Sequence, residues 1–170
     1  MSDQRLFGLA GWSGSGKTTL LTRLLPELTG RGLTVSTVKH AHHSFDVDKP
    51  GKDSWLHREA GATEVMISST QRWALMHEHR GAPEATLAEL LRHMSPVDLV
   101  IVEGFKGAPF AKLEVHRPAL GKPLMCRDNP HIVAVASDAP LAGLVLPVLP
   151  LDDVAAIARF ILAHFRLEAA

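Results

Sequence analysis

The sequence predicts an α/β fold in which helices flank a mostly parallel, twisted sheet with a few antiparallel edge strands. Residues 11–18 read G-W-S-G-S-G-K-T and match G-x-x-x-x-G-K-[ST] at every fixed position. An apolar run at 6–10 precedes this motif and a leucine-rich segment at 17–28 follows it, which is the strand–loop–helix context that the motif requires. A second apolar run at 98–104, D-L-V-I-V-E-G, is typical of a strand buried on both faces. Together these observations predict a P-loop NTPase.

The glycine-rich motif predicts a phosphate-binding loop. Gly14 and Gly16 allow backbone angles that a side chain would penalise, so the loop can turn several N–H groups towards phosphate oxygens. The positive end of the following helix dipole adds to the attraction. We expect Lys17 to reach the β- and γ-phosphates as a catalytic residue, and the Thr18 hydroxyl to ligate Mg²⁺. The predicted nucleotide-binding residues are Gly11, Trp12, Ser13, Gly14, Ser15, Gly16, Lys17, Thr18 and Thr19.

The first half of the chain continues with elements of both kinds. The expected helices and strands lie at 17–30, 33–38, 53–61, 64–67 and 72–76. Pro26 removes one backbone donor from the first helix and predicts a kink or an end there. Residues 33–38 close a parallel βαβ unit. Trp73 and Met76 are expected in the core, because burial is the usual state of large apolar side chains.

The second half predicts further strands and two helices. They are expected at 83–93, 99–103, 112–117, 132–136 and 144–148, with a final helix whose N-cap is Asp152. The segment 112–117 alternates polar and apolar side chains, which indicates a half-exposed strand at an edge. Because an open edge strand is a natural pairing surface, a homodimer could form there. Pro147 also favours an edge position for the last strand.

Three acidic residues are candidates for metal or base contacts. Glu103 stands at the carboxyl tip of a buried strand, where an acid meets the Mg²⁺ of a P-loop, usually through water, so we count it as catalytic and metal-binding. Asp48, two residues after Asp46 in a polar loop, is a further Mg²⁺ candidate, although both also fit solvated turn positions. Asp138 follows the strand at 132–136 and could accept hydrogen bonds from guanine N1 and N2, or could simply cap a turn.

Composition bounds the class of protein. A chain of 170 residues suits one domain, 1–170, with a substantial core. Lys and Arg together number 18, as do Asp and Glu, so the chain lacks the basic excess of a nucleic-acid binder. No apolar run approaches the roughly 20 residues needed to span a membrane, and no signal core opens the chain, so we expect a cytoplasmic protein. Cys126 is the only cysteine, which excludes an internal disulfide and cysteine metal frameworks.

Three histidines, His40, His42 and His43, leave two interpretations open. The alternation places His40 and His42 on one side of an extended segment, as a metal site would need. A transition-metal site requires three or four ligands with an oriented outer shell, and no cysteine lies nearby. We therefore favour polar loop roles for these side chains, such as contacts to phosphate or to a partner.

Several segments, taken in order, resemble one family closely. They are W-S-G-S-G-K-T-T-L-L, K-H-A-H-H-S-F-D-V-D-K-P-G-K-D-S, Q-R-W-A-L-M, V-E-G-F-K and V-A-V-A-S-D. Together they look like the MobB family of molybdopterin-guanine dinucleotide biosynthesis adapters. The resemblance implies a homodimeric GTP-binding protein with weak intrinsic GTPase activity. It also implies the guanylyltransferase MobA as partner, with other molybdenum cofactor biosynthesis proteins as further candidates. It leaves open whether the protein delivers GTP or molybdopterin.

Two other classes of function share the P-loop. A small-molecule kinase would need an acceptor pocket and usually an arginine-bearing lid, and no arginine-rich lid stands out in the sequence. A maturation GTPase that loads metal into another enzyme would use the three histidines as transient ligands. The absence of an evident catalytic glutamine or arginine finger predicts slow hydrolysis, which favours the adapter.

Overall fold

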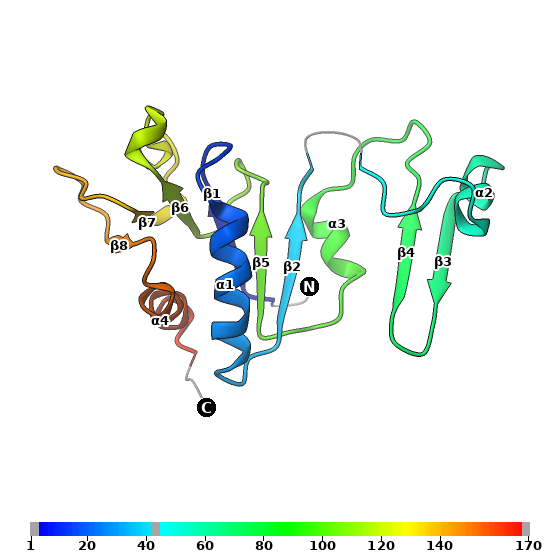
Figure 1. The fold of residues 1–170 in the computed structure, drawn as a ribbon, viewed down its shortest axis with the longest axis horizontal. Coiled ribbons are helices and arrows are strands. Elements are labelled where there is room, and N and C mark those ends of the chain that lie inside the picture. Colours follow the sequence, from blue (N-terminus) through cyan, green and yellow to red (C-terminus); the bar gives the residue numbers. More distant parts are fainter. Residues whose placement is uncertain (1–3, 42–44, 168–170) are drawn as a thin grey trace. The chain divides into compact units, whose positions relative to one another are not determined.

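The computed structural model describes residues 4–41 and 45–167 and divides into two compact units. The large unit contains the chain up to His40 and from Ser95 onward, and the small unit contains Ala41–Met94. Figure 1 shows the elements of both. The expectation of a single domain spanning 1–170 stays a prediction.

The large unit is built on a six-stranded sheet in the order β2-β5-β1-β6-β7-β8, with every neighbouring pair parallel. Its strands are β1 (Leu6–Ala10), β2 (Val35–Lys39), β5 (Leu99–Glu103), β6 (Lys112–His116), β7 (Ile132–Ser137) and β8 (Val148–Pro150). Its two α-helices are α1 (Lys17–Thr29) and α4 (Val154–Phe165), and two short 3₁₀ turns lie at Pro118–Leu120 and Met125–Arg127. The α/β fold with a mostly parallel sheet is thus confirmed.

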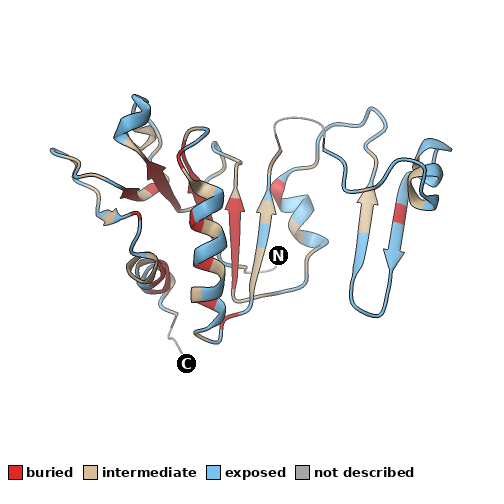
Figure 2. Cartoon of the chain, viewed as in Figure 1, coloured by how far each residue is buried: buried red, intermediate tan, exposed pale blue. Residues whose placement is uncertain are grey.

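The core lies between the two helices and one face of this sheet. Alternate strand residues such as Phe7, Leu9 and Leu113 are fully buried and form one cluster with Leu24 of α1 and Ile161 of α4. Figure 2 shows the buried positions concentrated on the central strands and on the inner sides of the helices. Each buried leucine or isoleucine side chain stabilises the fold by about 1.5–3 kcal/mol relative to an exposed one. This packing therefore fixes the position of the loop that connects β1 to α1.

Helix α1 runs through the proline that was expected to kink or end it. Pro26 lies inside the helix, which continues to Thr29. Gly30 then stops it, with its N–H donating to the carbonyl of Pro26 at 2.9 Å. At the other end of the chain, the N-cap of α4 is Asp153 and not the expected Asp152, because the Asp153 carboxylate accepts from the backbone N–H of Ala156.

The small unit holds α2 (Asp53–Glu59), β3 (Glu64–Ser68), β4 (Trp73–His77) and α3 (Leu87–Arg92). Strands β3 and β4 pair antiparallel in a separate sheet. Helix α3 begins later than the expected start at Pro83, because Thr86 and Glu89 form a reciprocal capping box.

The expectation that Trp73 lies in the core is wrong. Its side chain is 61% exposed, and Met66 on the same face of the β3–β4 sheet is 63% exposed. A sheet of two strands has two faces, and α2 packs on β3 from one side only in this unit. Met76, which points to the other face, is half-buried.

The expectation of an edge strand at 112–117 is also wrong. Strand β6 lies between β1 and β7, and all five of its residues are buried. Its polar side chains find partners inside the protein: the Lys112 ammonium donates to the carbonyls of Ala108 and Phe110, at 2.5 and 3.0 Å. The edges of the sheet are β2 and β8, and β8 begins later than expected, at Val148. No helix among the described residues combines the length and apolar character needed to cross a membrane.

Candidate nucleotide-binding site

The glycine-rich loop connects β1 to α1, and its backbone takes conformations that require glycine. Gly11 has φ 146° and Gly16, the N-cap of α1, has φ 98°. A Cβ atom on Gly11 would lie 2.5 Å from the backbone carbonyl oxygen of Val115 and 2.7 Å from the Ser15 hydroxyl. Because backbone atoms cannot move aside cheaply, the loop can keep this shape only with glycine at position 11.

Two polar side chains belong to the interior of the loop. The Ser15 hydroxyl is buried and has no hydrogen-bond partner among the described residues. The Lys17 ammonium donates to the carbonyl oxygens of Gly11 and Trp12, at 3.0 and 3.1 Å. Burial lowers the pKa of Lys17, Glu103 opposes this by attraction, and the nearby cations Lys106 and Lys39 lower it further. An anion in the loop would relieve both the crowding of positive charge and the unpaired hydroxyl.

Glu103 stands at the carboxyl end of β5, beside Leu9 of β1 in the parallel register. The turn after it is tightly packed, since a Cβ on Gly104 would lie 2.6 Å from the Cβ of His40. The ring of His40 stacks on Phe105, with 4.6 Å between centroids, and its backbone N–H donates to the Glu103 carbonyl at 2.8 Å. These contacts position the backbone around Glu103, and the negative charge of Glu103 acts to raise the pKa of Lys17.

Arg117, which is not among the residues predicted from the sequence, lies against the loop. Its Nε donates to the Ser15 carbonyl at 3.1 Å, and its Nη1 forms an ion pair with Asp138 at 2.5 Å. Asp138 directly follows β7, where Ser137 and Ala139 close the turn through two hydrogen bonds. The available signal was that Arg117 is the last residue of the predicted strand at 112–117, because the ends of strands are where such sheets bind ligands.

Trp12 joins the loop to the segment that follows β6. Its indole N–H donates to the carbonyl of Pro123 at 2.8 Å. The ammonium groups of Lys106 and Lys122 lie 5.7 and 5.9 Å from the centre of its ring. Ser13, Thr18 and Thr19 complete the predicted set and lie in the loop and the first turn of α1.

Asp48 lies in the small unit, and its role as a Mg²⁺ ligand stays a prediction. Its carboxylate accepts from the Ser54 hydroxyl at 2.8 Å and lies 3.6 Å from Arg58. Arg58 also pairs with Asp46 at 2.7 Å. The backbone N–H of Asp48, and after it the Arg58 guanidinium, hold the pKa of Asp46 below its ordinary value. These contacts give both aspartates a structural role within the small unit.

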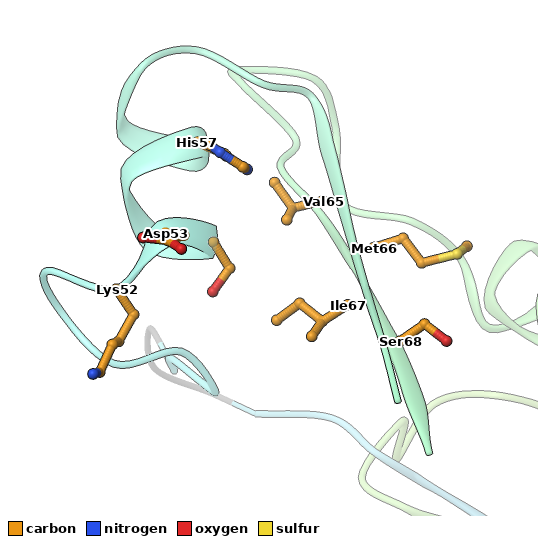
Figure 3. A pocket seen from close by; sticks show the side chains of 8 residues that line it. Lys52, Asp53, His57, Val65, Met66, Ile67 and Ser68 are labelled. Atoms are coloured by element: carbon orange, nitrogen blue, oxygen red, sulfur yellow. The ribbon is translucent and has the colours of Figure 1, made fainter. Parts of the chain in front are cut away.

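The described residues hold no cluster of three or more His, Cys, Asp or Glu side chains that could bind a metal on their own. Of the three histidines considered above, His42 and His43 lie outside the described residues. The small unit also has an open concavity of about 530 Å³ between α2 and β3. Figure 3 shows Val65 and Ile67 directed towards α2, with His57 facing them, while Met66 and Ser68 point away.

The large unit therefore has the features of a P-loop nucleotide-binding protein: a loop of glycines with positive φ, a lysine inside it and an acid on the adjacent strand. The comparisons identify the family more closely. Residues 6–138 match the profile of molybdopterin guanine dinucleotide synthesis protein B, MobB. The chain belongs to the MobB family.

Relatives and a solved structure agree with this family. The chain is 45% identical to the molybdopterin-guanine dinucleotide biosynthesis adapter protein of Escherichia coli K12, over 92% of this chain and 90% of the relative. It is 43% identical to the adapter protein of Haemophilus influenzae, over 94% and 90%. A crystal structure of molybdopterin-guanine biosynthesis protein B matches with a TM-score of 0.74 and 33% identity, covering 94% of this chain and 99% of that one.

Proposed function

We propose that the protein is an adapter in molybdenum cofactor biosynthesis that binds GTP with Mg²⁺ and assists the guanylyltransferase MobA. In that step molybdopterin is converted to molybdopterin-guanine dinucleotide. The names of relatives that are 43–45% identical support the pathway. The geometry of the loop around Lys17 supports the nucleotide.

The single observation that carries the nucleotide is the interior of the loop. It combines a buried hydroxyl without a partner among the described residues, a half-buried lysine and positive-φ glycines at the start of a helix. A triphosphate would supply acceptors for the Ser15 hydroxyl and the Lys17 ammonium, and the loop N–H groups would bind its oxygens. The residues present fit this group.

Magnesium would complete the site. Thr18 at the first turn of α1 and Glu103 at the tip of β5 supply the oxygen donors that Mg²⁺ prefers, the latter through water. The ion would neutralise charge on the β- and γ-phosphates. Positioning by Lys17, Thr18 and Glu103 alone would give only weak GTPase activity.

Molybdopterin is the second ligand that this role implies. The adapter would hold or present GTP, molybdopterin or both while MobA performs the transfer. Other molybdenum cofactor biosynthesis proteins are the next candidate partners. The names of the relatives and of the family indicate the pathway. A binding assay with the purified components tests each pair of protein and ligand or partner.

A homodimer is part of the proposal, but its surface differs from the one expected from sequence. Strand β6 is central and cannot pair with a second chain. The exposed apolar face of the β3–β4 sheet, with Met66 and Trp73, offers an alternative surface that would gain by burial.

Isothermal titration calorimetry of Lys17→Ala with GTP and Mg²⁺ tests the proposal. The wild-type chain should bind, and the variant should lose at least about tenfold in affinity, because one charge-assisted contact contributes 1.5–3 kcal/mol. Lys49→Ala, an exposed lysine of the small unit, is the matched control and should bind like wild type. Retained GTP affinity in Lys17→Ala would refute the phosphate assignment. A pull-down with MobA, with and without GTP and molybdopterin, then tests the adapter role.

A further inference from the structure

We propose that the side chains of Trp12, Lys106 and Lys122 form a second binding site beside the phosphate loop, for a flat heteroaromatic ligand with an anionic group, such as a phosphorylated pterin. The site deepens the proposed function, on which it rests, by giving molybdopterin a place on this chain. This role of the Trp12 side chain is separate from that of the loop backbone, which would bind the phosphates of the nucleotide.

The indole of Trp12 is a flat surface held in one orientation. Trp12 is half-buried, and its N–H donates to the carbonyl of Pro123 at 2.8 Å, which sets the direction of the ring. The backbone carbonyl of Trp12 accepts from the Lys17 ammonium at 3.1 Å. A flat ligand stacked on the exposed part of the indole would therefore lie beside the phosphates of a bound nucleotide.

Two ammonium groups approach this ring from two different loops. They are those of Lys106, between β5 and β6, and Lys122, between β6 and β7, at 5.7 and 5.9 Å from the ring centre. Neither forms an ion pair with an acid among the residues that the structure describes. Burial lowers the pKa of Lys17 and the charge of Lys106 lowers it further, so the positive potential extends from the loop to the indole.

Buried charged residues of β6 hold the loops that carry these two lysines. Lys112 donates to two carbonyls of the first loop, and Glu114 accepts from two backbone N–H groups of the second. The side-chain amide of Asn129 donates to the Lys106 carbonyl at 3.0 Å, which joins the two loops. Because the loops are already attached to the sheet and to each other, a ligand at the indole would need to order little of the protein.

The ring and the charges together define the chemistry of the ligand. An indole face stacks on flat heterocycles of many kinds, whereas two ammonium groups at its side favour one that carries a phosphate or a carboxylate. A pterin with a phosphate ester, such as molybdopterin, meets both requirements. The triphosphate of GTP would fill the loop around Lys17, so the chain would hold the two ligands side by side, as an adapter must in order to present them together.

Calorimetry of the full chain, with and without saturating GTP and Mg²⁺, tests the site with neopterin monophosphate, neopterin and inorganic phosphate. The monophosphate should bind at least about fivefold more tightly than either of the others. Trp12→Ala should weaken neopterin and its monophosphate alike, at least about fivefold, because stacking on an aromatic side chain contributes to both. The double variant Lys106→Ala/Lys122→Ala should weaken the monophosphate by a similar factor and leave neopterin unchanged. Arg159→Ala, an exposed cation on α4, is the control and should bind all probes like wild type.

The outcomes separate the second site from the proposed nucleotide binding. If GTP binds and neopterin monophosphate does not, or if these variants keep the affinity for neopterin monophosphate, the second site is overturned and nucleotide binding stands. Displacement of the monophosphate by GTP would also overturn the second site, because the indole would then belong to the nucleotide. If the monophosphate binds at Trp12 and GTP does not bind at all, nucleotide binding is overturned and the second site stands.

Fluorescence gives a reading that needs no substitution at the site. The chain has three tryptophans, so Trp55→Phe/Trp73→Phe leaves Trp12 as the only one. A pterin stacked on the indole should quench its fluorescence with the affinity that calorimetry gives. Binding without quenching would place the pterin elsewhere and overturn the site, and should Trp12→Ala fail to fold, this measurement and the lysine variant decide the question.

Discussion

Replacement of Glu114 should affect parts of the large unit well beyond strand β6. It is fully buried in the central strand β6, and both of its carboxylate oxygens accept backbone hydrogen bonds, from Met125 and Cys126 at 2.8 Å each. These two bonds tie the 3₁₀ turn at Met125–Arg127 to the sheet. The segment before this turn carries the Pro123 carbonyl that holds the Trp12 indole beside the phosphate loop.

The expected cost of Glu114→Ala follows from these contacts. Each hydrogen bond to a charged acceptor contributes about 1.5–3 kcal/mol, so losing two lowers the free energy of unfolding by at least about 3 kcal/mol. Glu114→Gln keeps one acceptor oxygen and should cost about 2 kcal/mol. Against a total of roughly 5–15 kcal/mol for a domain, both variants remain folded.

The thiol of Cys126 reports the local effect. Burial, followed by the negative charge of Glu114 and a hydrogen bond to it, raises the pKa of this thiol. Removing the charge in Glu114→Gln should therefore lower the pKa, so that a thiol reagent such as DTNB reacts at lower pH and faster at pH 8. Since Cys126 is the only cysteine, the signal belongs to one site.

Urea unfolding and DTNB kinetics on the same samples complete the test. Asp128→Ala, an exposed acid close in sequence, is the control and should change stability by less than about 0.5 kcal/mol. If Glu114→Gln matches wild type in both stability and thiol reactivity, the buried carboxylate does not anchor the turn and the reasoning fails.

Three further predictions concern separate parts of the molecule. Gly11→Ala should cost more than about 2 kcal/mol and abolish GTP binding, because its Cβ would meet the Val115 carbonyl at 2.5 Å; calorimetry and thermal melts check this. Asp98→Asn should reduce the loss of folding stability in acid. Hydrogen bonds from Thr34 hold the pKa of Asp98 below its usual value in the folded protein. The stabilisation from the Asp98 carboxylate is therefore fully present above its unfolded pKa of about 3.9 and is lost as pH falls through its folded pKa. Trp73→Ser should shift a homodimer towards monomer in sedimentation velocity.

Each of these has its own control. Gly107→Ala, where a Cβ meets nothing within 4 Å, should leave folding and binding intact, and equal damage at both glycines would contradict the steric argument. For Asp98, urea unfolding between pH 2 and 7 gives the free energy of unfolding as a function of pH. Its slope below pH 4 should be steeper for wild type than for Asp98→Asn, and identical slopes would refute the linkage. For Trp73, an unchanged dimer constant with a native melting temperature would remove the β3–β4 face from the proposed interface.

The phosphate loop was predictable because its constraints are local. The sequence from Gly14 to Thr18 specifies backbone angles, a helix start and the lysine between them, and none of these can be read only from a distant partner. Strand β5 was equally accessible, since four apolar residues in a row indicate burial on both faces. The exposure of Trp73 was not predictable, because it depends on how much of the two-stranded β3–β4 sheet the small unit covers.

The strand at 112–117 shows where the sequence pattern is ambiguous. Alternating charged residues usually mark a face in water, and Lys112, Glu114 and His116 fit that pattern. In the structure the charges are buried because loop backbone groups from 108–110 and 125–126 supply hydrogen bonds to the first two of them. Such partners come from loops without periodicity, so the pattern of the strand alone cannot reveal them.

The same ambiguity explains why Arg117 was overlooked. An edge position for the predicted strand at 112–117 would place Arg117 far from the phosphate loop, whereas the central position of β6 places it beside both Ser15 and Asp138. The charged residues that alternate along the central strand β6 therefore have a structural role. Their side chains are buried and form hydrogen bonds with the surrounding loops. In this protein those loops border the phosphate loop, so substitutions in β6 should alter nucleotide affinity even though none of its five residues belongs to the predicted binding set.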